Sequence, residues 1–383
     1  MSEVDSYARE PTRRHDMTVN APQPYNAEPP VEIIRSHYVT PTDYFYVRNH
    51  APVPDINPHK YKFVVDGMVA KPREVSLHEL KAKYTHHTVM CTLMCAGNRR
   101  TEMSNLKTVK GVGWGNAALS NAIWKGVRLC DVLEDVGAEM DNPHLHVDFY
   151  GGDPCVEENY KKGYGSSIPM SKAADPQGDV ILAFEMNGEP LPRDHGFPVR
   201  VIVPGYIGAR SVKWLKSITV KSDESESFFQ RRDYKVFLPS VNWDNVNDWW
   251  DRTPSLAGLS VQAAITNPKL SEAIATGSSY TVSGYALSGG NRIVRVDISL
   301  DGGKSWQTAR IFPGEEKGHD NRYWAWAFWD FHVDQFPSPC EIVCKALDIG
   351  NNGMPDDLAQ IWNLRGVMNN SWHHVSVPAK SKY

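Results

Sequence analysis

The sequence predicts two folded units of different class, a mixed α+β domain followed by an all-β sandwich. Up to about residue 250, short segments with strand alternation mix with short segments of helical periodicity, which is typical of an α+β domain and not of a doubly wound sheet. Beyond that point the helical periodicity disappears, and short alternating strands are separated by Gly-rich turns, as in β-sandwiches. The 383 residues are enough for two hydrophobic cores.

The first unit is preceded by residues 1–30, a polar and Pro-rich segment whose arginines follow no periodic pattern. We therefore expect this segment to be a loosely held arm. Ser76 and Glu79 have the spacing of a capping box and predict a short helix directly after Ser76. Thr88 to Met94 alternates like a strand, which would end where a Gly-containing turn begins.

A second helix and a hairpin are predicted further along the first unit. Apolar residues from Leu129 to Val136 recur at helical spacing, and Gly137 is well placed to end that helix. Residues 180–186 have the composition of a buried strand, and Asn187-Gly188 then supplies a tight hairpin turn. Further strands are expected at 197–203 and 212–220.

The second unit begins after a connector that we place at residues 242–254. Alternating apolar and polar residues at 294–300 predict a half-buried strand, which Asp301 and two glycines turn. Further strands are expected at 323–329 and 341–347. The predicted division is an arm over residues 1–30, a first domain over 31–250 and a second domain over 251–383.

The composition excludes several classes of protein. A hydrophobic fraction of 41% and 12 Trp indicate a folded globular chain. The net charge of −4 argues against general nucleic-acid binding, and no apolar segment approaches the length of a membrane span. The N-terminus lacks the apolar core of a signal peptide. The six cysteines form no small-domain disulfide framework, which favours a reducing compartment.

Cys95 is the most informative residue, because small residues and then Arg99 and Arg100 follow it at once. A thiolate is a soft ligand for a metal ion, and nearby guanidinium groups lower the pKa of a thiol and attract anions. The preceding strand delivers Cys95 to a turn, which is a common place for functional side chains. The chemistry alone leaves a buried structural cysteine equally open, since unpaired cysteines are usually core residues.

Residues 95–100 resemble the molybdenum-binding loop of the sulfite oxidase and assimilatory nitrate reductase family. Segments 44–50, 193–198, 208–214 and 362–366 also resemble family motifs, in family order, and the likeness extends from about residue 26 to about residue 375. Several motifs in matching order are far more specific than one short pattern. The resemblance implies a molybdenum-cofactor domain followed by an immunoglobulin-like domain that serves dimerisation, and hence a homodimer.

The resemblance also implies the residues of the site. Cys95 would be the protein ligand of a molybdenum ion that a molybdopterin holds through its dithiolene. The substrate pocket would consist of Arg48, Arg100, Trp114, Tyr234 and Arg365. The cofactor contacts would be Tyr46, Val47, Arg48, Asn49, His50, Asp153, His195, Arg200, Ser211, Val212 and Lys213.

The chemistry of these side chains agrees with such roles. Arginine suits a small oxyanion, because its planar fork stays charged and donates paired hydrogen bonds. Asp153 would accept hydrogen bonds from pterin ring N–H groups, whereas Arg200 and Lys213 would hold the phosphate. Tyr234 could donate a hydrogen bond or relay a proton, and Trp114 could exclude water.

Arg365 favours sulfite over nitrate as the substrate. Nitrate reductases that resemble this chain usually have an apolar residue at this point, and a dianion gains more from a third cation than nitrate does. We therefore expect two-electron oxidation of sulfite to sulfate. Residues 162–167 and 368–370 are similar to the nitrate branch, so a nitrate-reducing molybdenum module is the alternative. An alternative of another class is a β-rich protein that binds anions without catalysis.

The expected partners follow from what the sequence does not resemble. No segment resembles the cytochrome b5-like haem domain of many relatives, so we expect no haem and an external electron acceptor, either dioxygen or a separate cytochrome. This layout is similar to the haem-free plant-type enzymes. No nucleic-acid or membrane partner is expected. The final Ser381-Lys382-Tyr383 is a degenerate peroxisomal address, which leaves the cytoplasm and the peroxisomal matrix as expected locations and excludes secretion.

Overall fold

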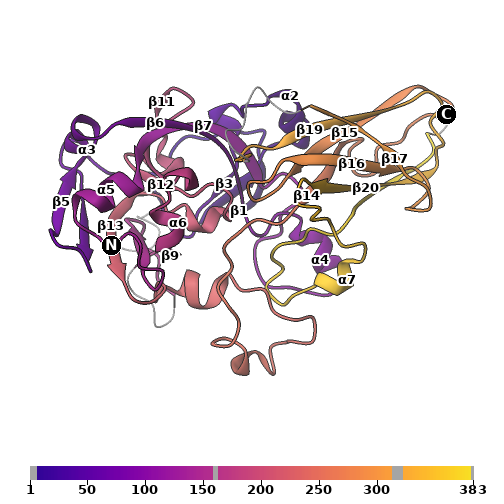
Figure 1. Ribbon diagram of the computed structural model, residues 1–383. Coiled ribbons are helices and arrows are strands. Elements are labelled where there is room, and N and C mark those ends of the chain that lie inside the picture. Colours follow the sequence, from indigo (N-terminus) through magenta and orange to yellow (C-terminus); the bar gives the residue numbers. More distant parts are fainter. Residues whose placement is uncertain (1–6, 158–162, 313–321, 381–383) are drawn as a thin grey trace.

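The computed structural model describes residues 7–157, 163–312 and 322–380, which form two regions (Figure 1). The first region mixes sheets with short helices, and the second consists of the orange strands on the right of the view. This arrangement confirms the prediction of a mixed helix-and-sheet domain followed by a β domain. No helix within the described ranges is long and apolar enough to cross a membrane.

Three sheets form the described part of the first region, and their neighbouring strands are antiparallel except for β4 and β13, which pair in parallel. The first sheet has the order β1 (Thr18–Pro22), β2 (Tyr25–Glu28) and β3 (Val47–Arg48). The second has the order β11 (Glu189–Pro190), β10 (Ile181–Met186), β7 (Leu119–Arg128) and β6 (His86–Met94), and β12 (Arg200–Ile202) also pairs with β10. The third has the order β5 (Arg73–Ser76), β4 (Lys62–Gly67), β13 (Leu215–Lys221), β8 (His146–Gly151) and β9 (Gly165–Pro169).

The helices are short. The α-helices are α2 (Val31–Ser36), α3 (Leu77–Lys83), α4 (Arg100–Leu106), α5 (Leu129–Asp135), α6 (Met170–Ala173) and α7 (Leu358–Ile361). Single 3-10 turns lie at Thr42–Tyr44, Pro176–Gly178, Arg193–His195, Gly208–Arg210 and Val246–Asp248, and a π-type turn lies at Phe229–Asp233. Helices of this length depend on packing against the sheets, because so few residues rarely hold a helix by themselves.

Predictions that rested on local chemistry are confirmed. The Ser76 hydroxyl caps α3 by accepting a hydrogen bond from the Glu79 N–H at 3.1 Å. Gly137 follows α5 with a φ of 71°, the left-handed conformation that ends helices. Asn187 and Gly188 have φ values of 53° and 86° and turn β10 into β11 as a tight hairpin.

Three predicted strands have different limits in the structure. β13 covers Leu215–Lys221, where a strand was expected at 212–220. β12 covers only Arg200–Ile202 of the segment expected at 197–203. β19 covers Ala327–Val333, later than the strand expected at 323–329. The reason is that the earlier part bonds to β6 of the first region: the Thr92 N–H donates to the Trp324 carbonyl at 3.0 Å, and the Trp326 N–H donates to the Thr92 hydroxyl at 2.9 Å.

The expectation of a loosely held arm is wrong for residues 18–28. These residues form the β1–β2 hairpin, which pairs with β3. The Glu28 carboxylate, which is 4% exposed, accepts hydrogen bonds from the Gly115 and Ala117 N–H groups at 2.8 and 3.0 Å. Earlier in the arm, the Arg13 guanidinium donates two hydrogen bonds of 2.8 Å to the Asp194 carboxylate.

The second region is a sandwich of two antiparallel sheets within the described residues. Across the sheets the strands are β14 (Gln262–Asn267), β15 (Tyr280–Leu287), β19 and β18 (Arg310–Phe312); and β17 (Gln307–Thr308), β16 (Ile293–Ser299), β20 (Cys340–Asp348) and β21 (His373–Val377). Val282 and Trp329 of one sheet share a buried core with Val296 and Ile342 of the other. Strands at 294–300 and 341–347 were predicted and are confirmed by β16 and β20.

The predicted connector at 242–254 is not a free linker. Val246 packs in a buried cluster with Met103 of α4 and with Trp362 and Leu364, which follow α7. Segments far apart in the sequence therefore meet beside the N-terminus of α4, directly after the turn that carries Cys95.

Candidate active site

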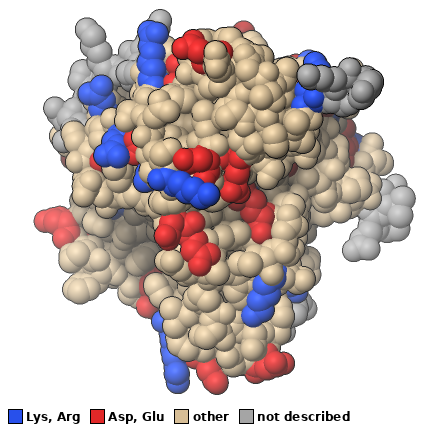
Figure 2. All heavy atoms as spheres, turned by 90° about the vertical axis from the view of Figure 1, so that its right-hand side faces the viewer, with Lys and Arg blue, Asp and Glu red and all other residues tan. Residues whose placement is uncertain are grey.

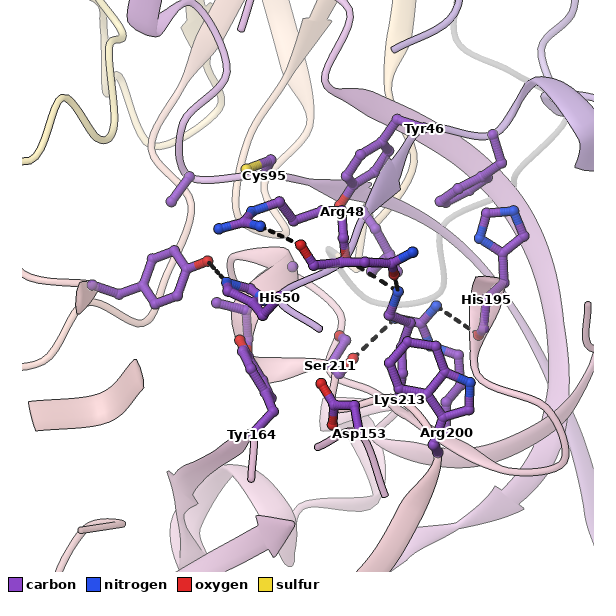
Figure 3. Close-up of a pocket in the computed structure, with 18 residues that line it drawn as sticks. Tyr46, Arg48, His50, Cys95, Asp153, Tyr164, His195, Arg200, Ser211 and Lys213 are labelled. Atoms are coloured by element: carbon purple, nitrogen blue, oxygen red, sulfur yellow. Dashed lines mark hydrogen bonds between the residues drawn. The ribbon is translucent and has the colours of Figure 1, made fainter. Parts of the chain in front are cut away.

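A cavity that is partly open to solvent lies at the end of β6 (Figure 3). The sequence-predicted residues that line it are Tyr46, Arg48, Asn49, His50, Cys95, Asp153, His195, Arg200, Ser211, Lys213 and Tyr234. They come from the segment around β3, the turn after β6, the segment after β8, and the turns on either side of β12 and β13. The topology of the sheets thus gathers residues from six separate stretches of chain around one space.

Cys95 lies in the wall of this cavity and is 4% exposed. Its N–H donates to the Ala118 carbonyl of the neighbouring segment at 2.9 Å, and its sulfur accepts a hydrogen bond from the Gly97 N–H at 3.4 Å. All six cysteines lie in the described ranges, and none of them is joined in a disulfide. A sulfur that faces a cavity and receives an N–H is suited to act as a thiolate ligand. The geometry therefore favours the metal-ligand interpretation over that of a structural core thiol.

Two cations, the buried Arg200 and the half-buried Lys213, donate to backbone carbonyls on the opposite side of the cavity. Arg200 donates to the carbonyls of His195 and Ser211 at 3.0 and 2.9 Å, and burial lowers its pKa to about 10. The Lys213 ammonium donates to the carbonyls of Arg48 and Asp194 at 3.1 and 2.8 Å. Burial, with a contribution from the charge of Arg200, lowers the pKa of Lys213 to about 7. Such desolvated cations gain from an anion that enters the cavity.

Asp153 faces the same space and supplies an acceptor. Its Oδ2 accepts a hydrogen bond from the Cys155 thiol at 3.2 Å, and burial raises the pKa of the Asp153 carboxyl. Asp153 Oδ1 and Arg200 Nε are buried and have no hydrogen-bond partner among the described residues. Buried groups of this kind are rare unless a ligand satisfies them. One acceptor, one donor and the cations thus fit a ring that carries N–H groups and a phosphate.

The metal would need ligands from outside the protein. Within the described ranges, no group of three or more His, Cys, Asp or Glu side chains is placed to hold a metal ion. A single Cys95 thiolate with a dithiolene supplied by a bound pterin is consistent with this finding. The residues present therefore fit a molybdopterin.

A hydrogen bond of 3.2 Å joins His50 Nε2 to the Tyr234 hydroxyl in the cavity wall. Burial raises the pKa of Tyr234, and burial together with the charges of Arg48 and Lys213 lowers the pKa of His50 well below its ordinary value. His195 lies against the Phe45 ring, and burial lowers its pKa to about 3. Both imidazoles are consequently neutral at physiological pH, while Tyr234 keeps its proton.

Arg48, Arg100 and Arg365 have different surroundings. Arg48 lines the cavity and donates to the Asn49 carbonyl at 2.6 Å. Arg100 begins α4, and its guanidinium lies so close to the backbone of Gly97 and Gly111 that a Cβ on either glycine would come within 2.8 Å of it. Arg365 forms an ion pair with Asp233 and also donates to the Asp233 carbonyl at 3.2 Å.

Arg365 lies close to Arg100, because the Arg100 Nε donates to the carbonyl of the next residue, Gly366, at 2.9 Å. Burial lowers the pKa of Arg365 to about 10, and the charges of Arg100 and Arg48 add to that effect. Arg100 has a lowered pKa for the same leading reason, burial, and the Arg48 charge again contributes. Positive charge is thus concentrated beside Cys95 at a cost that an anionic ligand would reduce.

The structure does not place every predicted residue in the described lining of the cavity. Arg100 and Arg365 lie outside it, as do Trp114, Val47 and Val212. Trp114 is fully buried in the apolar cluster that contains Cys95 and Tyr46, and its indole N–H has no partner among the described residues. Val47 lines a neighbouring cavity, whereas the side chain of Val212 belongs to the main core of the first region.

Some lining residues were missed from the sequence. They are Phe45, Leu93, Ala96, Tyr164, Gly208, Ala209 and Trp214. All except Leu93 lie inside segments that resemble the family, so membership of those segments was the available signal. Tyr164 illustrates the role: its hydroxyl donates to the Ala209 carbonyl at 2.8 Å, and its ring lies 4.8 Å from that of His50.

Comparison with protein families agrees with this site. Residues 50–229 match the oxidoreductase molybdopterin binding domain, and residues 253–380 match the Mo-co oxidoreductase dimerisation domain. The first match indicates a molybdopterin cofactor for this chain. A solved structure, the sulfane dehydrogenase SoxCD from Paracoccus pantotrophus, has the same fold, with a TM-score of 0.76 and 24% identity over 99% of this chain and 93% of that one.

Curated relatives are closer in sequence. The mitochondrial sulfite oxidase of Rattus norvegicus is 47% identical over 97% of this chain and 67% of its own length. The sulfite oxidase of Arabidopsis thaliana is 45% identical over 96% of this chain and 95% of its own length. A nitrate reductase of Hordeum vulgare is more distant, with 39% identity over 95% of this chain and 42% of its own length. The chain therefore belongs to the sulfite oxidase family of molybdenum-dependent oxidoreductases.

Proposed function

We propose that this chain oxidises sulfite to sulfate, in a two-electron reaction at a molybdenum–molybdopterin centre, and passes the electrons to an external acceptor. The observation that carries the proposal is that Arg48 lines the same cavity as Cys95, while Arg100 donates to the carbonyl of Gly366, the residue that follows Arg365. The charges of Arg48 and Arg100 contribute to the lowered pKa of Arg365, and a doubly charged oxyanion offsets such repulsion better than a singly charged one. Sulfite is such a dianion near neutral pH.

When bound, the molybdenum–pterin centre supplies the oxygen transfer that side chains cannot perform. Cys95 would ligate the metal, and Asp153 would accept hydrogen bonds from the pterin ring. Arg200 and Lys213 would bind the phosphate, because both are cations that line the cavity. His195 would pack against the same end of the cofactor as a neutral ring.

The chain's own residues would then act on the substrate. Arg48 would meet the oxyanion from the cavity wall, with Arg100 behind the Cys95 turn. Arg365 would add the third charge after sulfite competes with Asp233 for its guanidinium. Tyr234 would donate a hydrogen bond to the reacting oxygen, because its raised pKa keeps it protonated and His50 holds its hydroxyl in place.

The test is anaerobic addition of sulfite to the purified protein, with the thiolate-to-metal absorption band as the signal. We expect sulfite to bleach the band within one turnover. Nitrate added afterwards to the sulfite-reduced protein should leave most of the band bleached. Viologen-driven reduction of nitrate at a higher kcat/KM than sulfite oxidation would instead support the nitrate-reducing alternative. A protein purified without molybdenum from a host that makes the cofactor would favour non-catalytic anion binding.

We further propose that the β domain has the immunoglobulin-like arrangement and joins two copies of the chain, with the domain division near residue 250. The family description of residues 253–380 as a dimerisation domain supports this. Figure 2 shows that uncharged surface predominates on the side of the molecule formed by this domain, around small groups of acidic and basic side chains. Homodimer interfaces are typically depleted in charge. Light scattering of the full chain should give twice the monomer mass.

The proposal also covers the electron acceptor and the cellular location of the protein. We propose that electrons pass to dioxygen or to a separate cytochrome and that the protein carries no haem, which an absorption spectrum without a Soret band would test. The expected cytoplasmic or peroxisomal location rests on Ser381-Lys382-Tyr383, and these residues lie outside the described ranges. Imaging of the chain with and without this tail would test it.

A further inference from the structure

The turn that carries Cys95 is hydrogen-bonded to a segment of the β domain, residues 366–373. The Ala96 carbonyl accepts from the Met368 N–H at 2.7 Å, and the Arg99 carbonyl accepts from the Asn369 side chain at 3.1 Å. Arg100 Nε donates to the Gly366 carbonyl at 2.9 Å. The β domain thus makes direct bonds to several residues of the turn that presents the sulfur.

Arg99 holds an unusual backbone conformation at the centre of this contact. Its φ is 63°, in the left-handed region that residues other than glycine rarely adopt, and its side chain is fully buried. The guanidinium donates to both oxygens of Glu102, at 2.8 and 2.6 Å, and to the Ser371 carbonyl at 2.8 Å. A conformation of this kind persists only where surrounding bonds enforce it.

The side chain of Asn369 bonds to Arg99, Glu102 and Ser371, and the residue is fully buried. Its side-chain NH2 donates to the Arg99 carbonyl and to the Glu102 carboxylate, at 3.1 and 3.2 Å. Its oxygen accepts from the N–H and the hydroxyl of Ser371, at 3.2 and 2.9 Å. One amide therefore ties the backbone of the turn, the first turn of α4 and the β domain together.

We propose that Asn369 is a positioning residue for the metal ligand. It fixes the left-handed Arg99, and through it the direction of the Cys95 sulfur and of the Gly97 N–H that bonds to this sulfur. Groups that orient a metal ligand tune the metal almost as strongly as the ligand itself. The inference rests on the proposed function only in taking Cys95 as the ligand, and it gives the β domain a part in the site besides dimerisation.

The chain offers a matched control in the next residue. The Asn370 side chain donates to the Val261 carbonyl at 3.3 Å and, within the described residues, makes no bond to the Cys95 turn. Asn369→Ala and Asn370→Ala therefore remove the same atoms from adjacent positions of one segment. Asn369→Asp is a second variant, which keeps the volume and the acceptor that faces Ser371 but replaces the donating NH2 by an oxygen that faces the Arg99 carbonyl and the Glu102 carboxylate.

Amide hydrogen exchange of the full chain is the first measurement. The Arg99 and Arg100 N–H groups bond to the Gly115 and Gly97 carbonyls, at 2.6 and 2.9 Å. We expect both to exchange about tenfold faster in Asn369→Ala, because a buried hydrogen bond of ordinary strength has this effect. They should be unchanged in Asn370→Ala. This result does not depend on the substrate, so it stands even if sulfite oxidation fails in every variant.

Electron paramagnetic resonance of the Mo(V) state is the second measurement, with the thiolate-to-metal absorption band beside it. We expect shifted g-values and a shifted band in Asn369→Ala and Asn369→Asp, with a fall in kcat of about tenfold. Asn370→Ala should match the unmodified protein in each. Unchanged spectra in a folded Asn369 variant, or equal shifts in the Asn369 and Asn370 variants, would overturn the proposal.

Discussion

The cavity of the first region and the core of the β domain bury opposite kinds of side chain. Around the cavity, Arg200 and Asp153 are buried and Lys213 is half-buried, and Asp153 Oδ1 and Arg200 Nε have no partners among the described residues. The β domain has an apolar core between its sheets, and its buried Asp348 carboxylate is fully supplied with donors from Ser288, Asn291 and Asn352.

This difference separates stability from ligand binding. Buried polar groups without partners lower stability, and at the cavity Asp153 Oδ1 and Arg200 Nε lie where a ligand can satisfy them. The β domain contributes an ordinary core and, along residues 366–373, the bonds that hold the Cys95 turn. Changes near the cavity should therefore alter chemistry with little effect on folding, and changes in the sandwich core should do the reverse.

The largest expected effect is that of Cys95→Ser. A serine hydroxyl stays protonated at neutral pH and is a harder donor than a thiolate, so it should not replace the metal ligand. We expect sulfite turnover and the thiolate-to-metal band to be lost, with an unchanged circular dichroism spectrum. Retained turnover would contradict the whole account of the site.

Arg365→Met should raise the KM for sulfite by about 10- to 100-fold, because the substrate loses one of its charge partners. Each factor of ten corresponds to about 1.4 kcal/mol of binding free energy. Molybdenum content should remain normal, because Arg365 lies outside the cavity lining. Arg295→Met is the control: Arg295 pairs with Asp297 in the β domain, and its side chain is 53% exposed. A sulfite KM that is the same in both variants would remove Arg365 from substrate binding.

Ile298→Ala tests the other side of the comparison. Ile298 lies in β16 and is 1% exposed, so its truncation should lower the free energy of unfolding by about 2–5 kcal/mol. The Mo(V) spectrum and the sulfite KM should not change. Val294→Ala in the same strand, at a position that is 48% exposed, should change stability by less than about 0.5 kcal/mol. A shifted spectrum in Ile298→Ala would show that the sandwich core and the site are not separable.

The smallest expected effect is a pH dependence of anion binding. Because burial lowers the pKa of Lys213 to about 7, its charge is present below that pH and is lost as the pH rises through it. Binding of inorganic phosphate to the cofactor-free protein should therefore weaken several-fold from pH 6 to pH 8. Calorimetry should show a flatter profile in Lys213→Met. Lys62→Met, which changes an exposed lysine paired with Glu74, should keep the original profile.

Elements with local signals could be predicted from the sequence. The capping box at Ser76, the Gly137 stop and the Asn187-Gly188 turn depend on residues a few positions apart, and the structure has all three. The β1–β2 hairpin could not be predicted in this way. Its anchor is Glu28, whose partners Gly115 and Ala117 lie 87 and 89 positions further along the chain.

For the site, too, local patterns could be predicted from the sequence and contacts between distant segments could not. Most of the residues that resemble family positions do line the cavity, since each motif is a local pattern. The placement of Trp114 behind Cys95, and the ion pair of Arg365 with Asp233 across 132 positions, depend on packing between distant segments. No local pattern reports such contacts, so the sequence offered no signal for them.

The bond between Arg99 and the Ser371 carbonyl spans 272 positions, and this has a consequence for how the protein is made. While the ribosome is still translating, the Cys95 turn emerges long before the residues that brace it. In a nascent chain the Cys95 sulfur therefore lies in a loop that lacks these hydrogen bonds, and the bonds form only after the later strands have been synthesised and have docked. The geometry that the Cys95 turn has in the complete protein is thus available only after translation has passed Ser371.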